Sequence, residues 1–220
     1  MLEKIIDYHI RLAAPSDVDA LTELHCACFG PGDRIAASFG RDYVRATFSW
    51  QIRSQEAYIL VMETAGTIVG FLSVFDRPYT RPMFRACFGD LLSGLVRHPG
   101  LVFNPRLWRR LFRRSRSGDS LVVGTLTRSR TAFVIVGAVS KEARGQGIFP
   151  ALLQASERVS DSRGSQAILS PAYRANALAR RAYRKAGWTE VPALATSETV
   201  CHISFLDPEL AHILGFQAAE

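Results

Sequence analysis

The sequence predicts an α/β fold in a single domain. Over residues 57–75, two apolar runs rich in β-branched and aromatic residues flank Ala65-Gly66, as in a hairpin, and strand–turn–helix patterns occur twice, over residues 133–159 and 165–188. The chain of 220 residues is long enough for one sizeable domain and too short for two ordinary ones. We therefore expect one domain over residues 1–220.

The chain begins with a predicted strand and helix. Residues 9–12 (HIRL) are typical of a short strand, and Ser16 with Asp19 forms an approximate capping box for the helix that follows. The apolar residues of this helix recur at helical spacing and should face the core: Val18, Leu21, Leu24 and Cys28.

A second helix and the hairpin follow. Residues 30–33 (GPGD) should end the first helix, and the second helix is predicted over residues 42–55. The hairpin consists of strands at 57–62 and 67–75, joined through Ala65-Gly66.

A glycine-rich turn, Arg144-Gly145-Gln146-Gly147-Ile148, follows the apolar strand at 133–139 and precedes a helix with Pro150 in its first turn. Such a turn directs free backbone N–H groups and a helix dipole at one point, which suits phosphate or pyrophosphate. A dinucleotide motif is excluded because Pro150 occupies the third glycine position, and a P-loop is excluded because Ile148-Phe149 follows Gly147. Taken alone, the turn is equally typical of an ordinary surface loop.

A second cluster lies one helix and one strand further on. Residues 165–170 predict a strand, and a helix beginning near Asn176 ends at Gly187. Asn176, Ala179 and Tyr183 are three and four residues apart, so they share one helix face. Considered singly, Asn176 is most simply a helix cap and Tyr183 a core aromatic residue.

Together the two clusters resemble the acyl-CoA signature of the GNAT acetyltransferase superfamily, Q/R-x-x-G-x-G/A followed by N-x-x-A-x-x-x-Y-x-x-x-G-F/W. Residues 144–149 match the first half, except that Phe149 stands where the family usually has glycine or alanine. The second half is matched by Asn176, Ala179, Tyr183, Gly187 and Trp188. The resemblance is densest over 133–188 and implies the family's mixed sheet with helices on both faces, its last two strands lying within 192–206.

The resemblance also implies the chemistry. Acetyl-CoA would be the co-substrate, no metal would be needed, and a primary amine would attack the thioester directly. A strand bulge, expected at Gly137, would let Ala138 and Val139 offer backbone groups to pantetheine and the thioester oxygen. Asn176 would bind the pantetheine arm and Tyr183 would protonate the leaving thiolate as general acid. The pyrophosphate would be held by Arg144, Gly145, Gln146, Gly147, Ile148 and Phe149.

The general base is not identified by the sequence. Many family members carry a glutamate on the fourth strand, but residues 131–139 contain no acid. Asp76 after the third strand and His25 on the first helix are candidates, as are Glu198 and His202 near the last hairpin. Residues of these types at such positions more often have a structural role than a catalytic one. The alternative is a chain of water molecules that takes up the proton in place of a dedicated base.

The connection over residues 77–130 is predicted to be a helical, basic insertion. Pairs of apolar residues recur every four positions from Met83/Phe84 to Leu95/Val96, which indicates a helix with a wide apolar face. Asn104-Pro105 should start another helix, apolar on one face and arginine-rich on the other. Arg97 to Arg116 includes seven arginines and no acid, so the net charge of +7 is concentrated here.

Four interpretations of this basic segment remain open. It is a solvated helix face, a peripheral contact with an anionic membrane through Arg97–Arg116, a lid over acceptor and CoA phosphates, or, least favoured, a nucleic-acid contact. We expect no nucleic-acid partner, because no recognised binding module accompanies the arginines.

A looser resemblance bears on the acceptor. The basic helical pair and the first-helix segment Leu24–Phe29 are similar to those of GNAT enzymes of bacterial surface-polysaccharide and amino-sugar pathways, which implies a nucleotide- or lipid-linked amino sugar as the small-molecule acceptor. A protein or antibiotic amine is an alternative, and so is a catalytically silent CoA-binding or membrane-docking module.

Composition favours a cytoplasmic protein. Acidic residues among the first seven argue against a signal peptide, and no apolar run reaches membrane-spanning length. The four cysteines, Cys26, Cys28, Cys87 and Cys201, fit neither zinc spacing nor a secreted disulfide framework. The sequence gives no indication of oligomeric state.

Overall fold

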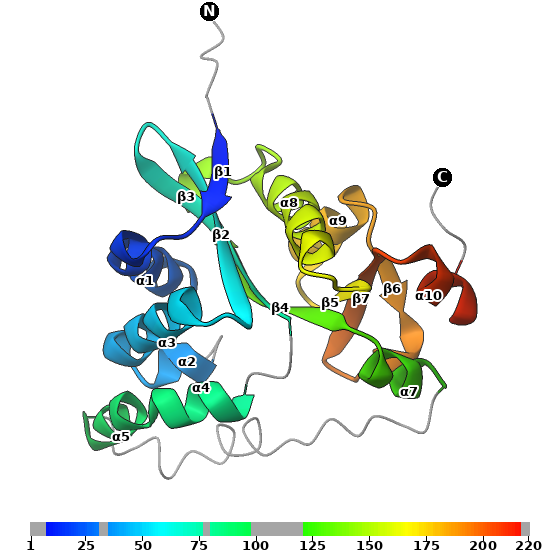
Figure 1. The fold of residues 1–220 in the computed structure, drawn as a ribbon. Coiled ribbons are helices and arrows are strands. Elements are labelled where there is room, and N and C mark those ends of the chain that lie inside the picture. The colour runs from blue at the N-terminus through cyan, green and yellow to red at the C-terminus, as the bar shows by residue number, and fades with distance from the viewer. Residues whose placement is uncertain (1–7, 31–34, 77–79, 98–120, 217–220) are drawn as a thin grey trace, which may run out of the picture.

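The computed structural model describes residues 8–30, 35–76, 80–97 and 121–216 (Figure 1). A seven-stranded sheet has the order β1-β2-β3-β4-β5-β7-β6. Its strands are β1 (His9–Leu12), β2 (Ala57–Thr64), β3 (Thr67–Phe75), β4 (Thr131–Val139), β5 (Ala167–Tyr173), β6 (Thr189–Val191) and β7 (Thr199–Phe205). Only β4 and β5 pair in parallel among these neighbours, so the predicted mixed sheet is confirmed.

Helices cover both faces of the sheet (Figure 1). In the described part of the chain they are α1 (Val18–Cys28), α2 (Ile35–Ser38), α3 (Arg41–Arg53), α4 (Thr80–Ala86), α5 (Phe88–Arg97), α7 (Leu121–Arg128), α8 (Ile148–Ser162), α9 (Ala177–Lys185) and α10 (Pro208–Ile213). Helices α1 and α3 bury one face around Phe48 and Phe71, whereas α8 buries the other around Leu72 and Leu152. None of the described helices is both long and apolar enough to cross a membrane.

The predicted hairpin is present as β2 and β3. Ala65 and Gly66, which join the strands, both have positive φ angles, of 47° and 74°. Two consecutive left-handed residues give a turn whose twist matches that of the flanking strands. The local sequence therefore determines this connection.

The sheet parts between β4 and β5. Their parallel pairing is limited to Thr131–Phe133 on β4 and Ala167–Leu169 on β5, although both strands continue further. Beyond this point β4 pairs only with β3, and β5 only with β7. A gap between two adjacent strands therefore opens toward the C-terminal end of β4.

The bulge expected at Gly137 lies elsewhere. Val136 pairs with Ser73 and Val134 with Val74, so Ile135 is the extra residue on β4. Gly137 is required for a different reason, because a Cβ there would lie 2.7 Å from both Leu72 Cδ1 and Phe149 Cε2. The backbone and Phe149 approach each other closely at this position.

Three helix predictions need correction. Ser16 does not cap α1; instead, the Asp17 carboxylate accepts the Ala14 N–H at 2.7 Å, ahead of a short 3-10 helix. The predicted helix from Met83 to Val96 is two helices, α4 and α5, that meet at Cys87. Helix α7 was not predicted.

The connection between β3 and β4 therefore contains α4, α5 and α7 in its described part. The helix expected from Asn104, with most of the arginine segment, lies outside the described residues.

Candidate active site

A cleft of about 550 Å³ lies where β4 ends and α8 begins. Its walls come from the end of α1, the end of β4, the glycine-rich turn, the start of α8 and one face of α9. The lining residues are Cys28, Phe29, Gly137, Ala138, Val139, Ala143, Arg144, Gly145, Gly147, Ile148, Phe149, Pro150, Asn176, Leu178, Ala179, Arg181, Ala182 and Lys185. The end of β4, beyond its pairing with β5, and the N-terminus of α8 thus line one cavity.

The glycine-rich turn presents backbone rather than side chains to this cleft. Gly145 and Gly147 have φ angles of +82° and +79°, in the left-handed region that favours glycine. A Cβ at either position would meet no atom within 4 Å, so the space beside them is open. Gly147 is also the N-cap of α8, and the first N–H groups of a helix have no carbonyl within the helix to bind. The turn therefore offers an anion several donors and the positive end of a helix dipole.

The end of β4 forms the adjoining wall. Ala138 and Val139, both predicted to contact the co-substrate, line the cleft. The Val139 carbonyl accepts a hydrogen bond from Arg144 Nε at 3.2 Å and one from the Cys28 thiol at 3.6 Å. The Arg144 side chain therefore lies along the cleft wall. The Gln146 side chain is directed elsewhere, with its amide donating to the Glu142 carbonyl at 3.3 Å.

Helix α9 forms the opposite wall. Asn176 caps this helix, as the simpler interpretation held, because its side-chain oxygen accepts the Ala179 N–H at 3.0 Å. Asn176 nevertheless lines the cleft as well.

Of the α9 residues that line the cleft, Ala179 belongs to the predicted motif. Four others were not predicted: Leu178, Arg181, Ala182 and Lys185. They are spaced three and four residues apart, which was a readable signal of one helix face. Cys28 and Phe29 were also missed as lining residues, and no local pattern indicates them, because tertiary packing brings the end of α1 to the cleft.

Tyr183 does not line the cleft. Its side chain is 4% exposed, and its hydroxyl forms a 2.6 Å hydrogen bond with Ser170 Oγ. Phe149, which does line the cleft, packs edge-on against the Tyr183 ring at 5.7 Å between centroids. The phenol predicted to be the general acid therefore lies behind the Phe149 wall.

A histidine stacks on the other side of this phenol. The His202 and Tyr183 rings are 4.5 Å apart at an interplanar angle of 17°. His202 is fully buried, and desolvation lowers its pKa below the usual value, although Glu190 Oε1 lies 3.4 Å from Nε2. Glu190 is itself held by Arg180 at 2.8 Å. His202 is therefore neutral at pH 7 and acts as a packing surface for Tyr183.

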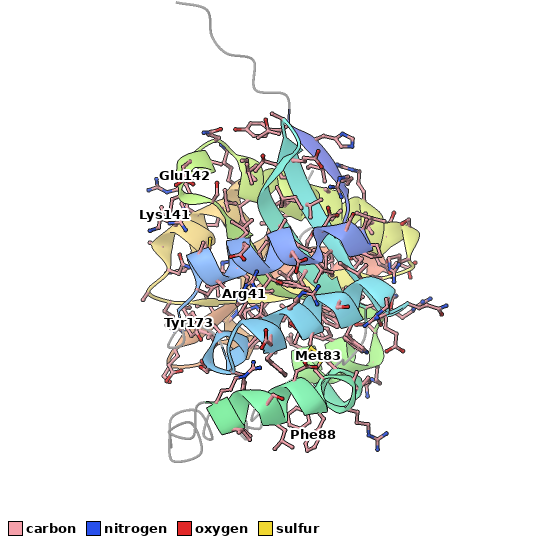
Figure 2. The ribbon with its side chains drawn as sticks, turned by 90° about the vertical axis from the view of Figure 1, so that its left-hand side faces the viewer. Arg41, Met83, Phe88, Lys141, Glu142 and Tyr173 are labelled. Carbon is pink, nitrogen blue, oxygen red and sulfur yellow. The ribbon has the colours of Figure 1, made fainter. Side chains whose placement is uncertain are left out.

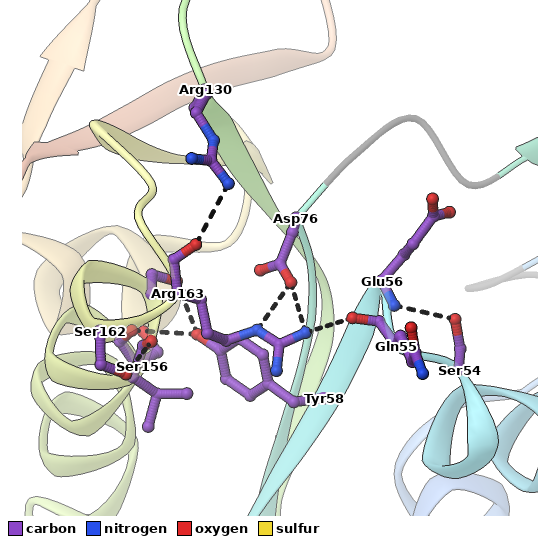
Figure 3. A network of polar contacts seen from close by, with 11 residues as sticks. Ser54, Gln55, Glu56, Tyr58, Asp76, Arg130, Ser156, Ser162 and Arg163 are labelled. Atoms are coloured by element: carbon purple, nitrogen blue, oxygen red, sulfur yellow. Dashed lines mark hydrogen bonds and ion pairs between the residues drawn. The ribbon is translucent and has the colours of Figure 1, made fainter.

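Asp76 lies at the other end of α8 from the cleft. Its carboxylate accepts hydrogen bonds from Arg163, which follows α8 and also donates to the Gln55 carbonyl (Figure 3). Helix α8 has 15 residues and is about 22 Å long at 1.5 Å per residue. Asp76 thus lies about one helix length from the glycine-rich turn and does not line the cleft.

The remaining base candidates are also outside the cleft lining. His25 is 3% exposed and packs against the rings of Phe29 and Phe48 at 5.0 and 5.8 Å. Glu198 is exposed in the turn before β7, where its carbonyl accepts the Arg174 N–H.

Cations are the only charged side chains that line this cleft in the described part of the chain: Arg144, Arg181 and Lys185. In the same ranges, no group of three or more His, Cys, Asp or Glu side chains is placed to hold a metal ion. The cleft thus combines positive charge, free backbone donors and parted strands. Such a cleft accommodates an elongated anionic ligand with amide groups along its length.

A mixed sheet with two separated neighbouring strands, next to a helix N-terminus that lines a cleft, is typical of acyl-CoA-dependent transferases. Sequence comparison makes the class specific: the profile of the acetyltransferase (GNAT) family matches residues 18–188. The chain belongs to this family and is an acetyl-CoA-dependent N-acetyltransferase. No curated protein matches the sequence.

Solved structures agree with the fold at low sequence identity. The PaiA N-acetyltransferase of Thermoplasma acidophilum, solved with coenzyme A, has a TM-score of 0.58 and 12% identity, covering 91% of this chain and 99% of its own. An N-acetyltransferase of Staphylococcus aureus Mu50 has a TM-score of 0.56 and 15% identity, covering 91% of this chain and 99% of its own. The ribosomal-protein-S18-alanine N-acetyltransferase of Escherichia coli has a TM-score of 0.53 and 12% identity over 97% of each chain.

Proposed function

We propose that this enzyme transfers the acetyl group by direct attack of a primary amine in a ternary complex. Backbone donors around Gly145 and Gly147 bind the pyrophosphate, and Arg144 adds positive charge. The pantetheine arm lies between β4 and β5, where Ala138, Val139 and Asn176 line the cleft. The observation that carries this proposal is that the end of β4, beyond its pairing with β5, and the N-terminus of α8 line the same cavity.

The proton path uses water and Tyr183. No carboxylate lines the described cleft, so the amine loses its proton to water rather than to a dedicated base. Tyr183 protonates the departing thiolate. For that step the Phe149 ring must turn aside, because it lies against Tyr183 at the cleft wall.

The acceptor in this proposal is an amino sugar of a surface-polysaccharide pathway, carried on a nucleotide or lipid phosphate. The arginines of Arg97–Arg116 support it, because guanidinium groups bind phosphate with bidentate geometry. We place the enzyme in the cytoplasm, with this segment in contact with the anionic inner membrane face. An aminoglycoside-type or peptide amine is the competing acceptor.

Thiol release from acetyl-CoA tests the activity directly. The panel consists of UDP-linked amino sugars, free amino sugars, an aminoglycoside and a peptide with a free N-terminus. We expect the highest kcat/KM for a phosphate-linked amino sugar. Faster turnover of the aminoglycoside or the peptide would overturn the acceptor assignment and leave the transferase intact.

The second candidate is a catalytically silent CoA-binding protein, favoured by the absence of an acid on β4 and in the cleft lining. Calorimetry with CoA separates it from the enzyme. Tight CoA binding without turnover of any amine would support the silent protein, whereas no heat with CoA or acetyl-CoA would remove both candidates.

A further inference from the structure

Phe149 lies between strand β4 and helix α9, at the wall of the cleft. Its ring touches β4 on one side, because a Cβ at Gly137 would lie 2.7 Å from Phe149 Cε2. On the other side it packs edge-on against the Tyr183 ring, with 5.7 Å between centroids. The Tyr183 hydroxyl in turn forms a 2.6 Å hydrogen bond with Ser170 Oγ of β5. The Phe149 ring therefore bridges β4 and a residue that is bound to β5.

This bridge lies beyond the point where the two strands separate. Parallel pairing of β4 with β5 ends at Phe133, four residues before Gly137. Figure 2 shows Lys141, just after β4, and Tyr173, the last residue of β5, toward the same edge of the molecule. The strands thus run to one edge without pairing, and the Phe149 ring lies against the unpaired part of β4.

The ring narrows the cleft beside Tyr183. Residue 149 is in the first turn of α8, where the glycine or alanine of the family signature would leave the volume of the ring open. Phe149 lines the cleft, whereas Tyr183 is 4% exposed behind it. Turning the ring aside would uncover the phenol, but the ring would stay in the cleft because its backbone is fixed in α8. The space beside Tyr183 is therefore small in either position of the ring.

The neighbours of the ring are tightly packed. His202 stacks on the Tyr183 ring at 4.5 Å, which holds Tyr183 against movement deeper into the core. On the β4 side, Leu72 is fully buried, and its Cδ1 would also lie 2.7 Å from a Cβ at Gly137. The size of the side chain at residue 149 is therefore the feature that decides how much room a ligand has beside Tyr183.

We infer that Phe149 sets the length of the acyl group that the cleft accepts. The inference rests on the proposed function, in which the thioester lies beside Tyr183 so that the phenol can protonate the thiolate. An acetyl group extends only one methyl group beyond the carbonyl carbon, whereas each further methylene group competes with the ring for the same apolar volume. One methylene group in an apolar pocket changes discrimination by about 10- to 200-fold. Phe149 thus excludes longer chains such as butanoyl.

Calorimetry with three probes tests the inference without an acceptor amine. The probes are CoA, acetyl-CoA and butanoyl-CoA, each titrated into the full-length wild type and into Phe149→Ala. We expect wild type to bind butanoyl-CoA at least about tenfold more weakly than acetyl-CoA. Phe149→Ala should bind the two thioesters alike, because the volume of the ring is then open to the longer chain. The affinity for CoA, which carries no acyl group, should change little.

Leu152→Ala is the matched control, because Leu152 is a fully buried residue of the same helix outside the cleft lining. It also loses apolar packing, but it should keep the preference of wild type for acetyl-CoA. Thermal melting shows whether both variants are folded. Phe149→Leu, with an apolar side chain of intermediate size, should give an intermediate preference and provides the measurement if Phe149→Ala does not fold.

The outcomes distinguish this inference from the proposed function. Equal binding of acetyl-CoA and butanoyl-CoA by wild type, or an unchanged preference in folded Phe149→Ala, would overturn the inference and leave the proposed transferase intact. An equal change in affinity for CoA and for butanoyl-CoA in Phe149→Ala would mean that the ring acts on the coenzyme rather than on the acyl group, which also overturns it. No heat with any of the three probes would overturn both the inference and the proposed function.

Discussion

At the scale of single residues, two glycines shape the turn that we propose binds the pyrophosphate. Gly145 and Gly147 have positive φ and border open space, so neither could be replaced without strain, and a side chain at either would enter the cleft. Backbone donors bind without the entropy loss of ordering long side chains. This is why a turn with little side-chain chemistry can be the main anion site.

Gly147→Ala should therefore lose CoA affinity by more than its loss of stability explains. Gly215→Ala is the matched control, because Gly215 has φ of +74° and also borders open space, but lies outside the cleft. Both variants should lose about 1 kcal/mol of stability from backbone strain. Calorimetry should show CoA binding at least tenfold weaker in Gly147→Ala only. Equal CoA affinity in the two variants would remove the turn from the site.

Tyr183 is the residue whose role depends most on movement. Tyr183→Phe should lower kcat about 100-fold with the affinity for CoA unchanged, since a general acid acts only on the reacting complex. Ser170→Ala is the control, because it removes the 2.6 Å partner but keeps the phenol. If both variants lose the same activity, the hydroxyl is a structural group and the proton comes from water.

At the scale of elements, α9 has two functions on two faces. Its inner face carries Tyr183 into the core, and the cleft face carries Leu178, Arg181 and Lys185. Because both cations lie near the positive turn, we expect them to contact the phosphates of the co-substrate.

Arg181→Glu should weaken CoA binding about tenfold, and the loss should shrink at high salt as charges are screened. Arg184→Glu, an exposed position on the same helix outside the cleft lining, should change affinity little. Titrations of both variants at low and high ionic strength provide the measurement. A similar loss in both variants would indicate a general field effect rather than a contact.

Elements differ in how far the sequence predicts them. The hairpin was predicted well, because Ala65-Gly66 forms the turn and apolar, β-branched runs flank it on both sides. The helix from Met83 to Val96 was predicted as one, but it divides at Cys87, and α7 was missed. Tertiary packing supplies most of the stability of such short helices: α4 and α5 pack against α3, whereas α7 packs with Val191 and Leu210.

At the scale of the whole molecule, the sheet consists of two parts joined by a short pairing. Strands β1 to β4 meet β5, β7 and β6 only through Thr131–Phe133 and Ala167–Leu169. Helix α8 packs against both parts. A co-substrate between β4 and β5 would therefore connect the two parts.

CoA should raise thermal stability for this reason. A ligand at 100 times its Kd contributes about 2.7 kcal/mol, which corresponds to an increase in Tm of about 5–10 °C for a chain of this size. Scanning calorimetry with and without CoA measures the shift, and hydrogen exchange should slow at Val134–Val139. A rise in Tm without protection on β4 would place the ligand elsewhere.

The sequence by itself determined the glycine-rich turn, the strand and helix that flank it, the hairpin and the family resemblance, because each depends on residues close together in the chain. The tertiary structure decided which side chains reach the cleft. It placed Tyr183 behind Phe149, Asp76 at the far end of α8, the bulge at Ile135 and the end of α1 beside Val139. It also divided one apolar helix face into a buried and an exposed half. These outcomes depend on packing between segments distant in sequence, and local periodicity carries no information about that packing.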